Sequence, residues 1–382
     1  MRHAVRVGVI GGGQLARMMI PAAVELGVDL RVLAEDHGMS AALAATQVGD
    51  YRDIATVLAF AREADVITFD HEHVPQVVLR ALVDAGVAVR PGPDALHFAQ
   101  DKLAMRERLG GLGLPVPDWA KVQTPAELAE FLVDHGGVGV LKTARGGYDG
   151  KGVRVVHAAD EASDWFGALA DGEALLVEER VTFVRELAQM VARRPSGEVV
   201  AWPLVETLQV GGVCSEVIAP APHSAGKLAQ VAGEVAVTIA QQLDVTGVMA
   251  VEMFETTDER VLVNELAMRP HNSGHWSMDG SVTGQFEQHL RAVLDLPLGA
   301  TGTRDAWSVM VNVLGGPIGG QLPDRYQAAM AGRPNVKFHS YGKPPRAGRK
   351  VGHVTAVGDD LDVVTYDARA AAAAFNAELP LA

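Results

Sequence analysis

The sequence lacks three things: a second cysteine, an excess of positive charge and a long hydrophobic run. Cys214 is its one cysteine, so an intrachain disulfide and a metal cage built from thiolates are both excluded. Lys and Arg number 33 against 47 Asp and Glu, which gives a formal net charge of −14. This balance argues against a nucleic-acid or anionic-membrane partner, because both need a basic face. A small anionic ligand is still compatible where positive charge gathers locally.

No apolar run approaches the roughly 18 residues that a membrane span needs. From Met1 the chain runs directly into an apolar strand pattern at residues 5–10, which leaves no room for a cleavable leader. We therefore expect a cytoplasmic protein. Cys214 lies in the segment GGVCSEVIA, which is typical of the start of a strand, and we expect its thiol to be buried and unreactive.

The 382 residues suffice for two or three domains with buried cores. Over the first ninety residues, short apolar runs alternate with helical patterns, which predicts an α/β domain with a parallel sheet. The expected strands cover residues 5–10, 30–34, 66–69 and 87–89, and the expected helices cover residues 14–26 and 75–85.

The later part of the chain reads as α+β. Thr124 and Glu127 form a capping box that opens a helix ending near residue 135. Hairpin and strand patterns follow, then a helix at residues 225–243 and an Ala-rich helix at residues 368–377. The expected antiparallel strands cover residues 138–143, 153–156, 175–181, 186–193, 199–209 and 215–219.

A hairpin near residue 258 carries the most informative pair. Residues 248–255 and 260–267 read as strands, and a turn centred between Asp258 and Glu259 places Glu252 opposite Glu265. Two ionised carboxylates roughly 5 Å apart repel by about 3 kcal/mol at an effective dielectric near 20. A shared proton, a nearby Arg or a divalent cation must offset this repulsion. The cluster Arg269, His271 and Asn272, which follows directly, is typical of a site that binds anions and moves protons.

The glycine-rich segment from Lys142 to Gly152 predicts a phosphate-binding loop. It contains four glycines in seven residues between two strands, with cations at Lys142, Arg145 and Lys151. Its ending differs from a Walker A motif. Residues 343–353 place four cations in eight residues with no acid, and the interleaved Gly and Pro favour a shaped loop that binds a phosphate monoester.

Three weaker patterns allow more than one interpretation. The turn at residues 11–16 matches G-x-G-x-x-A, and Glu35 follows about twenty residues on, as in dinucleotide-binding folds. A mononucleotide-like turn and a purely structural turn give the same pattern. Glu178 and Glu186 end and begin strands, where they either bind a nucleotide or form a solvated charge cluster. His71 and His73 lie at the carboxyl end of a strand, where we favour a hydrogen-bonding rim over a metal site.

Together these segments resemble the ATP-grasp superfamily, and within it the N5-carboxyaminoimidazole ribonucleotide synthases, the ATPase subunits of phosphoribosylaminoimidazole carboxylase. The resemblance rests on GGGQLARM at 11–18, DKLAMRERLGGLGLPVP at 101–117, LKTARGGYDGKG at 141–152, VEER at 177–180, NELAMRPHNSGHW at 264–276 and GRKVGH at 348–353. The family's first motif usually has glycine where Ala16 stands, and its strand-end motif usually has Glu where Asp70 stands.

The resemblance implies a three-domain ATP-grasp fold of class α/β and α+β with an N-terminal open parallel sheet. The expected domains are a pre-ATP-grasp domain at 1–100, a mobile lid at 120–181, and a C-terminal domain made of 101–119 and 182–382. The implied reaction carboxylates the exocyclic amine of 5-aminoimidazole ribonucleotide with bicarbonate through carboxyphosphate, at the expense of ATP. It also implies Mg²⁺ (or Mn²⁺) and a homodimer.

The family's functional residues carry over by motif. Catalysis falls to Arg269, His271 and Asn272, and the metal to Glu252 and Glu265. ATP binding falls to Lys102, Lys142, Arg145, Gly146, Gly147, Tyr148, Asp149, Gly150, Lys151, Gly152, Glu178, Glu179, Val181, Glu186, Asn264 and Glu265. Substrate binding falls to Gln14, Glu72, Tyr148, Lys151, Arg269, His271, Asn272, Lys343, Arg349 and Lys350.

Three other functions compete with this interpretation. An NAD-dependent oxidoreductase rests on the turn at residues 11–16 and on Glu35, but it leaves Glu252, Glu265 and the glycine-rich loop without a purpose. Another ATP-grasp carboxylase or ligase would leave the terminal GRKVGH unexplained. A nucleotide-binding regulatory module predicts ATP binding without turnover.

Overall fold

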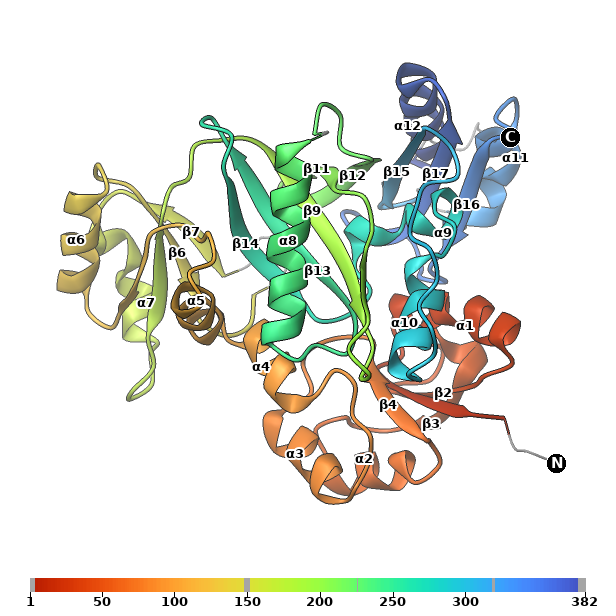
Figure 1. Cartoon of the computed structure of the whole chain (residues 1–382), viewed down its shortest axis with the longest axis horizontal. Coiled ribbons are helices and arrows are strands. Elements are labelled where there is room, and N and C mark those ends of the chain that lie inside the picture. Colours follow the sequence, from red (N-terminus) through yellow and green to blue (C-terminus); the bar gives the residue numbers. More distant parts are fainter. Residues whose placement is uncertain (1–3, 148–151, 225, 318–319, 377–382) are drawn as a thin grey trace.

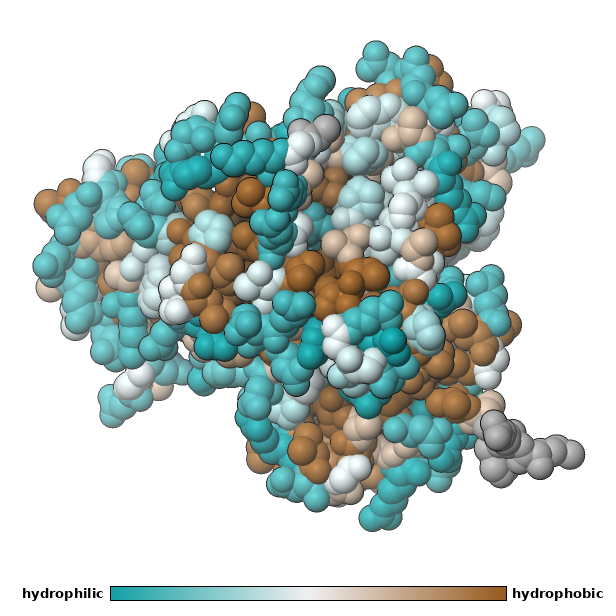
Figure 2. All heavy atoms as spheres, viewed as in Figure 1, coloured by the Kyte–Doolittle hydropathy of each residue, from teal (hydrophilic) through white to brown (hydrophobic). Residues whose placement is uncertain are grey.

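The computed structural model describes residues 4–147, 152–224, 226–317 and 320–376, and these residues form three β-sheets. In Figure 1 the N-terminal sheet and its helices lie at the bottom, a small sheet lies at the left, and the large sheet occupies the centre and the upper right. The described helices include none that is long and apolar enough to cross a membrane. Hydrophilic side chains cover much of the rim of the face shown in Figure 2, while hydrophobic ones gather toward its middle.

The N-terminal sheet is parallel with the strand order β3-β2-β1-β4, which confirms the predicted α/β domain. The predicted strand at 87–89 is wrong, because Val89 makes only a single bridge to Ile67. The prediction also missed a strand and a helix between residues 45 and 61. The elements are β1 (Arg6–Ile10), α1 (Gln14–Leu26), β2 (Asp29–Ala34), β3 (Ala45–Val48), α2 (Ile54–Ala61), β4 (Val66–Phe69), α3 (Gln76–Asp84) and α4 (Pro93–Gln100).

Side-chain caps start the missed helix and the helix that leads out of this domain. Asp53 accepts hydrogen bonds from the amides of Ala55 and Thr56 and so caps α2. Asp101 accepts from the amides of Leu103 and Ala104 and starts α5 (Lys102–Gly111). This cap fixes the direction in which Lys102 leaves the N-terminal domain.

The small sheet is antiparallel with the strand order β5-β8-β6-β7. The predicted capping box of Thr124 and Glu127 is confirmed at the start of its main helix. A core that includes Leu128 and Val177 holds this sheet and helix together. Its elements are β5 (Trp119–Val122), α6 (Pro125–Asp134), β6 (Gly139–Thr143), β7 (Val153–Val156), α7 (Ser163–Gly167) and β8 (Leu175–Glu179).

The large sheet has nine strands within the described residues, in the order β14-β13-β9-β11-β12-β15-β17-β16, with β10 paired to β9. Its strands are β9 (Phe183–Arg193), β10 (Val199–Ala201), β11 (Val205–Val210), β12 (Val213–Ala219), β13 (Gly247–Thr256), β14 (Val261–Ala267), β15 (Trp307–Leu314), β16 (Val336–Ser340) and β17 (Lys350–Gly358). Its helices are α8 (Lys227–Gln242), α9 (Ser277–Gly280), α10 (Gln285–Val293), α11 (Tyr326–Met330) and α12 (Leu361–Asn376).

Two predicted elements of this part need correction. The single strand expected at 199–209 is two strands, because the segment between them contains Pro203, which has no amide hydrogen for the ladder. The last helix begins at Leu361 rather than at residue 368. Asp360 accepts hydrogen bonds from the amides of Asp362 and Val363 and starts it there.

A shared core fixes the N-terminal domain against the large sheet. Leu15 and Met19 of α1 belong to one buried cluster with Phe286 and Leu290 of α10 and with Tyr341, which follows β16. The first helix of the chain therefore packs beside elements that follow it by more than 250 residues, and α1 and α10 lie side by side in Figure 1.

Candidate functional site

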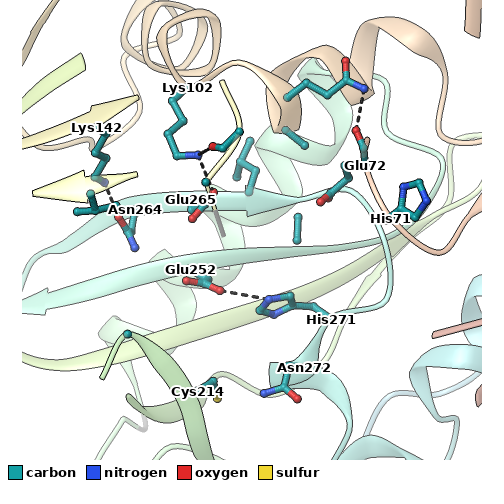
Figure 3. A pocket seen from close by; sticks show the side chains of 18 of the residues that line it. His71, Glu72, Lys102, Lys142, Cys214, Glu252, Asn264, Glu265, His271 and Asn272 are labelled. Carbon is teal, nitrogen blue, oxygen red and sulfur yellow. Dashed lines mark hydrogen bonds and ion pairs between the residues drawn. The ribbon is translucent and has the colours of Figure 1, made fainter. Parts of the chain in front are cut away.

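A cavity of about 830 Å³ lies where the three sheets meet. It is bounded by the segment after β4, by β6 and β7 of the small sheet, and by β13, β14 and the segment that follows β14 (Figure 3). Fourteen of the residues predicted for the site line it: Glu72, Lys102, Lys142, Arg145, Gly146, Gly147, Glu186, Glu252, Asn264, Glu265, Arg269, His271, Asn272 and Lys350.

The other predicted residues lie outside the lining of this cavity or outside the described residues. Tyr148, Asp149, Gly150 and Lys151 belong to the part of the chain that the structure does not describe. Seven predicted site residues are described by the structure but do not line the cavity: Gln14, Gly152, Glu178, Glu179, Val181, Lys343 and Arg349.

The predicted pairing of Glu252 with Glu265 is confirmed, and a β-bulge produces it. Near the hairpin tip Met253 lies opposite Val263, whereas Glu252 lies opposite Glu265. Asn264 is therefore one extra residue in β14. Neighbouring residues of a regular strand point to opposite faces, yet Asn264 and Glu265 both line the cavity, as a bulge permits.

The charges around this pair favour a cation. Removal from bulk water, together with the Glu265 and Glu186 carboxylates, raises the pKa of Glu252 to about 8. Glu252 Oε1 lies 3.2 Å from His271 Nε2, and Glu265 Oε1 lies 3.3 Å from Lys102 Nζ. A divalent cation offsets the mutual repulsion of two such carboxylates.

The donor set fits magnesium shared with a nucleotide. Among the described residues, no three His, Cys, Asp or Glu side chains are arranged to enclose a metal ion. Mg²⁺ is usually held by one or two carboxylates together with substrate phosphates, and Glu252 and Glu265 supply those two carboxylates.

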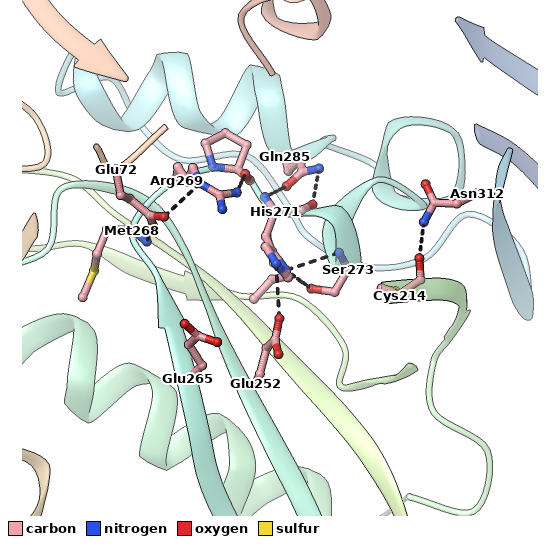
Figure 4. Close-up of polar contacts among 12 residues, drawn as sticks. Glu72, Cys214, Glu252, Glu265, Met268, Arg269, His271, Ser273, Gln285 and Asn312 are labelled. Atoms are coloured by element: carbon pink, nitrogen blue, oxygen red, sulfur yellow. Dashed lines mark hydrogen bonds and ion pairs between the residues drawn. The ribbon is translucent and has the colours of Figure 1, made fainter. Parts of the chain in front are cut away.

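The segment after β14 is held by the N-terminal domain. Glu72 accepts hydrogen bonds from the Met268 amide at 2.6 Å and from Arg269 Nε at 3.1 Å (Figure 4). The sequence indicated a substrate contact for Glu72. In the structure this carboxylate orients Arg269, and Glu72 also lines the cavity.

His271 is neutral in this environment. Burial, and then the charges of Arg269 and Lys350, lower its pKa well below the ordinary value. Its Nδ1 accepts a hydrogen bond from the Ser273 amide at 3.4 Å, and an amide can only donate. The ring hydrogen therefore sits on Nε2, which faces Glu252.

Asn272 and Cys214 form another wall of the cavity. The side chain of Asn272 is buried, and the Cys214 thiol, a weak hydrogen-bonding group, lies beside its amide. Within the described chain the amide makes no hydrogen bond to a nitrogen or oxygen atom, so it is available to a ligand. Burial raises the pKa of Cys214 to about 12, which confirms the buried thiol expected from the sequence.

A buried ion network supports Lys142. Its Nζ lies 2.7 Å from Glu178 Oε2 and donates to Asn264 Oδ1 at 3.1 Å. Glu178 also pairs with Arg106, whose side chain is fully buried and which donates to the Asn264 carbonyl at 2.6 Å. Sequence reasoning missed Arg106. The signal available was a cation between the apolar residues Met105 and Leu109 of a helix.

The glycine-rich loop is anchored at its described ends. Arg145 Nε lies 2.9 Å from Asp101 Oδ2, and Lys102 Nζ donates to the Gly146 carbonyl at 3.3 Å. Gly152 has a φ of +73°, and a Cβ there would lie 2.6 Å from Thr143 Oγ1, so this position needs glycine.

Of two basic residues that follow β15 in the chain, Lys343 contacts the N-terminal domain and Lys350 lines the cavity. Lys343 Nζ lies 2.7 Å from Gln14 Oε1 at the start of α1. Lys350 lines the cavity, and its neighbour Arg349 donates to the Pro344 carbonyl at 3.4 Å. Residues predicted from opposite ends of the sequence thus come together.

The turn at residues 11–16 is filled by the protein's own carboxylates. Glu35 accepts from the Gly12 amide at 2.9 Å, and Asp70 accepts from the Ala16 amide at 2.8 Å. Burial alone would raise the pKa of Glu35, but hydrogen bonds from His71 and Gly12 lower it to about 2. These carboxylates occupy the amides that a dinucleotide phosphate needs, which argues against the oxidoreductase interpretation.

Three family models match successive parts of the chain. The ribonucleotide synthetase preATP-grasp domain matches residues 4–100, the ATP-grasp domain residues 107–286, and the phosphoribosylaminoimidazole carboxylase C-terminal domain residues 308–366.

Whole proteins match as well. The N5-carboxyaminoimidazole ribonucleotide synthase of Mycobacterium tuberculosis is 50% identical over 360 residues, which cover 93% of this chain and 84% of that protein. A solved ADP complex of an N5-carboxyaminoimidazole ribonucleotide synthetase is 34% identical, with a TM-score of 0.88 and 97% of each chain covered. The Aspergillus clavatus N5-carboxyaminoimidazole synthase, solved with ADP and 5-aminoimidazole ribonucleotide, is 30% identical, with a TM-score of 0.87 and coverage of 98% of this chain and 99% of that one.

Proposed function

This chain belongs to the N5-carboxyaminoimidazole ribonucleotide synthase family of ATP-grasp ligases, and we propose that the cavity between its three sheets is where ATP, bicarbonate and 5-aminoimidazole ribonucleotide react. It is an ATP-dependent enzyme of purine biosynthesis with the ATP-grasp fold and an N-terminal pre-ATP-grasp domain. We propose, in addition, the roles of the site residues, the bound metal, the domain limits and the mobile lid.

ATP binds between the small sheet and β13–β14. Lys142 and Lys102 neutralise its phosphates, and the glycine-rich loop from Arg145 to Gly152 covers them. Both lysines line the cavity. Lys102 contacts the Glu265 carboxylate there, and Lys142 pairs with the buried Glu178, which lies outside the lining. Glu186, on the cavity wall, accepts hydrogen bonds from the ribose, and Glu178, Glu179 and Val181 flank the adenine at the end of β8.

Glu252 and Glu265 hold Mg²⁺ (or Mn²⁺), which, when bound, neutralises charge on the phosphates during transfer. The raised pKa of Glu252 supports this assignment, because a buried carboxylate next to another carboxylate favours an added positive charge. Asn264 and Lys142 orient the nucleotide beside this pair through their mutual hydrogen bond.

Arg269, His271 and Asn272 surround bicarbonate and the carboxyphosphate formed from it. Arg269, oriented by Glu72, supplies a fixed positive charge to the transferred group. His271 has Nδ1 occupied by Ser273, so it offers the cavity an N–H group and acts as a hydrogen-bond donor to an oxygen of carboxyphosphate. The exocyclic amine of the ribonucleotide then attacks the carboxyl carbon, the bond from that carbon to the bridging oxygen breaks, and the departing phosphate takes up the proton that the amine loses.

Carboxyphosphate hydrolyses readily in water, so the site must be dry while it exists. The small sheet at residues 120–181 acts as the lid, since β6 and β7 form one wall of the cavity. Gln14, Lys343, Arg349 and Lys350 bind the ribonucleotide and its phosphate at the opposite side. Tyr148 and Lys151, which lie outside the described residues, are further proposed ligands of the ribonucleotide. The homodimer and the cytoplasmic location stay predictions.

The observation that carries the proposal is the pairing of Glu252 with Glu265 at a cavity that Arg269 and His271 also line. The test is ADP release with bicarbonate and 5-aminoimidazole ribonucleotide supplied together and separately. We expect rapid release only when both are present. Glu265→Gln should abolish ADP formation while the fold is retained.

The matched control is Asp258→Asn at the tip of the same hairpin, where an exposed carboxylate pairs with Arg260. This variant should keep full turnover. Near-normal turnover of Glu265→Gln would contradict the metal assignment.

A further inference from the structure

Gln285, the first residue of α10, is fully buried and holds both backbone polar groups of His271. Its Oε1 accepts from the His271 amide at 2.9 Å, and its Nε2 donates to the His271 carbonyl at 2.9 Å (Figure 4). The Gln285 side chain thus satisfies the backbone amide and carbonyl of His271, as a neighbouring strand would. Gln285 itself does not line the cavity.

A third hydrogen bond uses the remaining hydrogen of the Gln285 side-chain amide. Gln285 Nε2 lies 2.6 Å from His275 Nδ1. Because the His271 backbone dictates which end of the Gln285 amide is oxygen and which is nitrogen, the second amide hydrogen points to His275. Burial lowers the pKa of His275 well below the ordinary value, so its neutral ring accepts this bond.

The segment between His271 and α10 is shaped around Gln285. Ser277 Oγ accepts from the Gln285 amide at 3.0 Å and donates to the Gly274 carbonyl at 2.6 Å. A Cβ on Gly274 would lie 2.5 Å from Gln285 Oε1, so only glycine allows this approach. The contact is therefore built by several residues at once.

The helix that carries Gln285 is itself tied to the strand of Glu252. One turn later, His289 Nδ1 accepts from the Val248 amide of β13 at 3.1 Å, and its Nε2 lies 2.8 Å from Thr68 Oγ1 of β4. Through α10, the position of the His271 backbone is therefore fixed relative to both β13 and the N-terminal sheet.

We propose that Gln285 is a positioning residue that sets where His271 presents its Nε2–H to the reacting group. This inference rests on the role given to His271 under the proposed function. Gln285 acts through the His271 backbone and touches neither nucleotide nor substrate. Loss of its hydrogen bonds displaces the imidazole without changing the binding of ATP.

Two substitutions test this inference. Gln285→Met keeps the volume but no hydrogen bond, and we expect kcat to fall about 100-fold, the effect of a misplacement of about 1 Å, with an unchanged KM for ATP. Gln285→Glu keeps the acceptor, but its ionised form cannot donate to the His271 carbonyl. A protonated carboxyl can, so the activity of this variant relative to the native enzyme should rise as pH falls.

Gln288 is the matched control. It lies on the same helix, is equally buried, accepts from the Gly299 amide at 2.8 Å and donates to the Gly299 carbonyl at 2.7 Å. Gly299 does not line the cavity. Gln288→Met and Gln288→Glu should therefore lower the midpoint of thermal unfolding but leave kcat and its pH profile as in the native enzyme.

These outcomes distinguish a failure of the positioning role of Gln285 from a failure of the role proposed for His271. A Gln285→Met enzyme with native kcat, or a Gln288→Met enzyme with the same loss, overturns the positioning role. If Gln285→Met does not fold, the pH profile of Gln285→Glu decides: a profile parallel to that of the native enzyme overturns the role, and relative recovery toward low pH supports it. Native turnover of His271→Ala would instead refute the proposed role of His271.

Discussion

The carboxylate of Glu72, three residues after β4, accepts hydrogen bonds from both the backbone amide of Met268 and the guanidinium of Arg269. These two residues follow β14, so a side chain of the N-terminal domain aligns Arg269, the residue to which we assign a catalytic role, at the edge of the large sheet. The cavity is therefore a joint product of both domains. Neither domain can hold Arg269 in this orientation alone.

Glu72→Ala should lower kcat for ribonucleotide-dependent ADP release about 10- to 100-fold, because a hydrogen bond to a charged group contributes about 1.5–3 kcal/mol. Steady-state kinetics with all three substrates measures this. Asp94→Asn is the control, since Asp94 pairs with Arg80 on the exposed surface of the same domain and its loss should leave kcat unchanged. Equal effects of the two substitutions would contradict the role of Glu72.

Glu178→Gln should lower the free energy of unfolding by about 3–5 kcal/mol, because it leaves the fully buried Arg106 without its anionic partner. Urea unfolding followed by circular dichroism measures the change. In α7 of the same domain, Asp164 makes an exposed ion pair with Arg154, and Asp164→Asn should leave the free energy of unfolding nearly unchanged. A cost for Glu178→Gln as small as that of the control would show that the buried network contributes little.

Lys343→Met should raise the KM for 5-aminoimidazole ribonucleotide about 10-fold or more and leave the KM for ATP as it is, because one charge-assisted hydrogen bond to the phosphate is lost. Initial rates at varied concentrations of each substrate distinguish the two constants. Lys337 is exposed on β16, and Lys337→Met is the matched control for lost charge. If the KM for ATP rises instead, Lys343 contacts ATP rather than the ribonucleotide.

His289 should make the protein less stable in acid. Burial lowers its pKa to about 3 in the folded protein, against about 6.5 in the unfolded chain. Between these two values the unfolded chain binds a proton that the folded protein does not, so stability is fully present above pH 6.5 and is lost as pH falls toward 3. The contribution of this one group reaches about 1.4 kcal/mol per pH unit.

The measurement is urea unfolding from pH 7 to pH 4. His289→Asn should be less stable at pH 7 but should lose less stability on acidification than the native protein. Parallel curves for the two proteins would show that His289 is protonated in the folded state, contrary to its buried position between Thr68 and Val248.

The sequence predicted the pairing of Glu252 with Glu265 correctly, but for an incomplete reason. The prediction assumed a regular hairpin, whereas the strand pairs near the tip are offset by one residue and Asn264 restores the register. A bulge depends on how the strand packs and twists, which no local pattern of side chains shows. The same bulge explains why Asn264 and Glu265 point into one cavity.

The fold of the N-terminal domain was predictable where apolar periodicity is strong, as in α1, and was missed where it is not. The sequence prediction assigned no element to residues 35–65, and α2 was missed although Asp53 caps it. Local sequence patterns cannot predict contacts between residues that lie far apart in the chain. Glu72 contacts Arg269 across 197 positions, and Gln285 returns to His271 through side-chain hydrogen bonds that no spacing rule predicts.

The hydrogen bond between Gln14 and Lys343 joins residues 329 positions apart. If Lys343 anchors the ribonucleotide as proposed, a chain still being translated lacks that anchor until the segment after β16 has emerged from the ribosome. A nascent chain that already contains Lys102 and Lys142 then lacks this contact to the ribonucleotide.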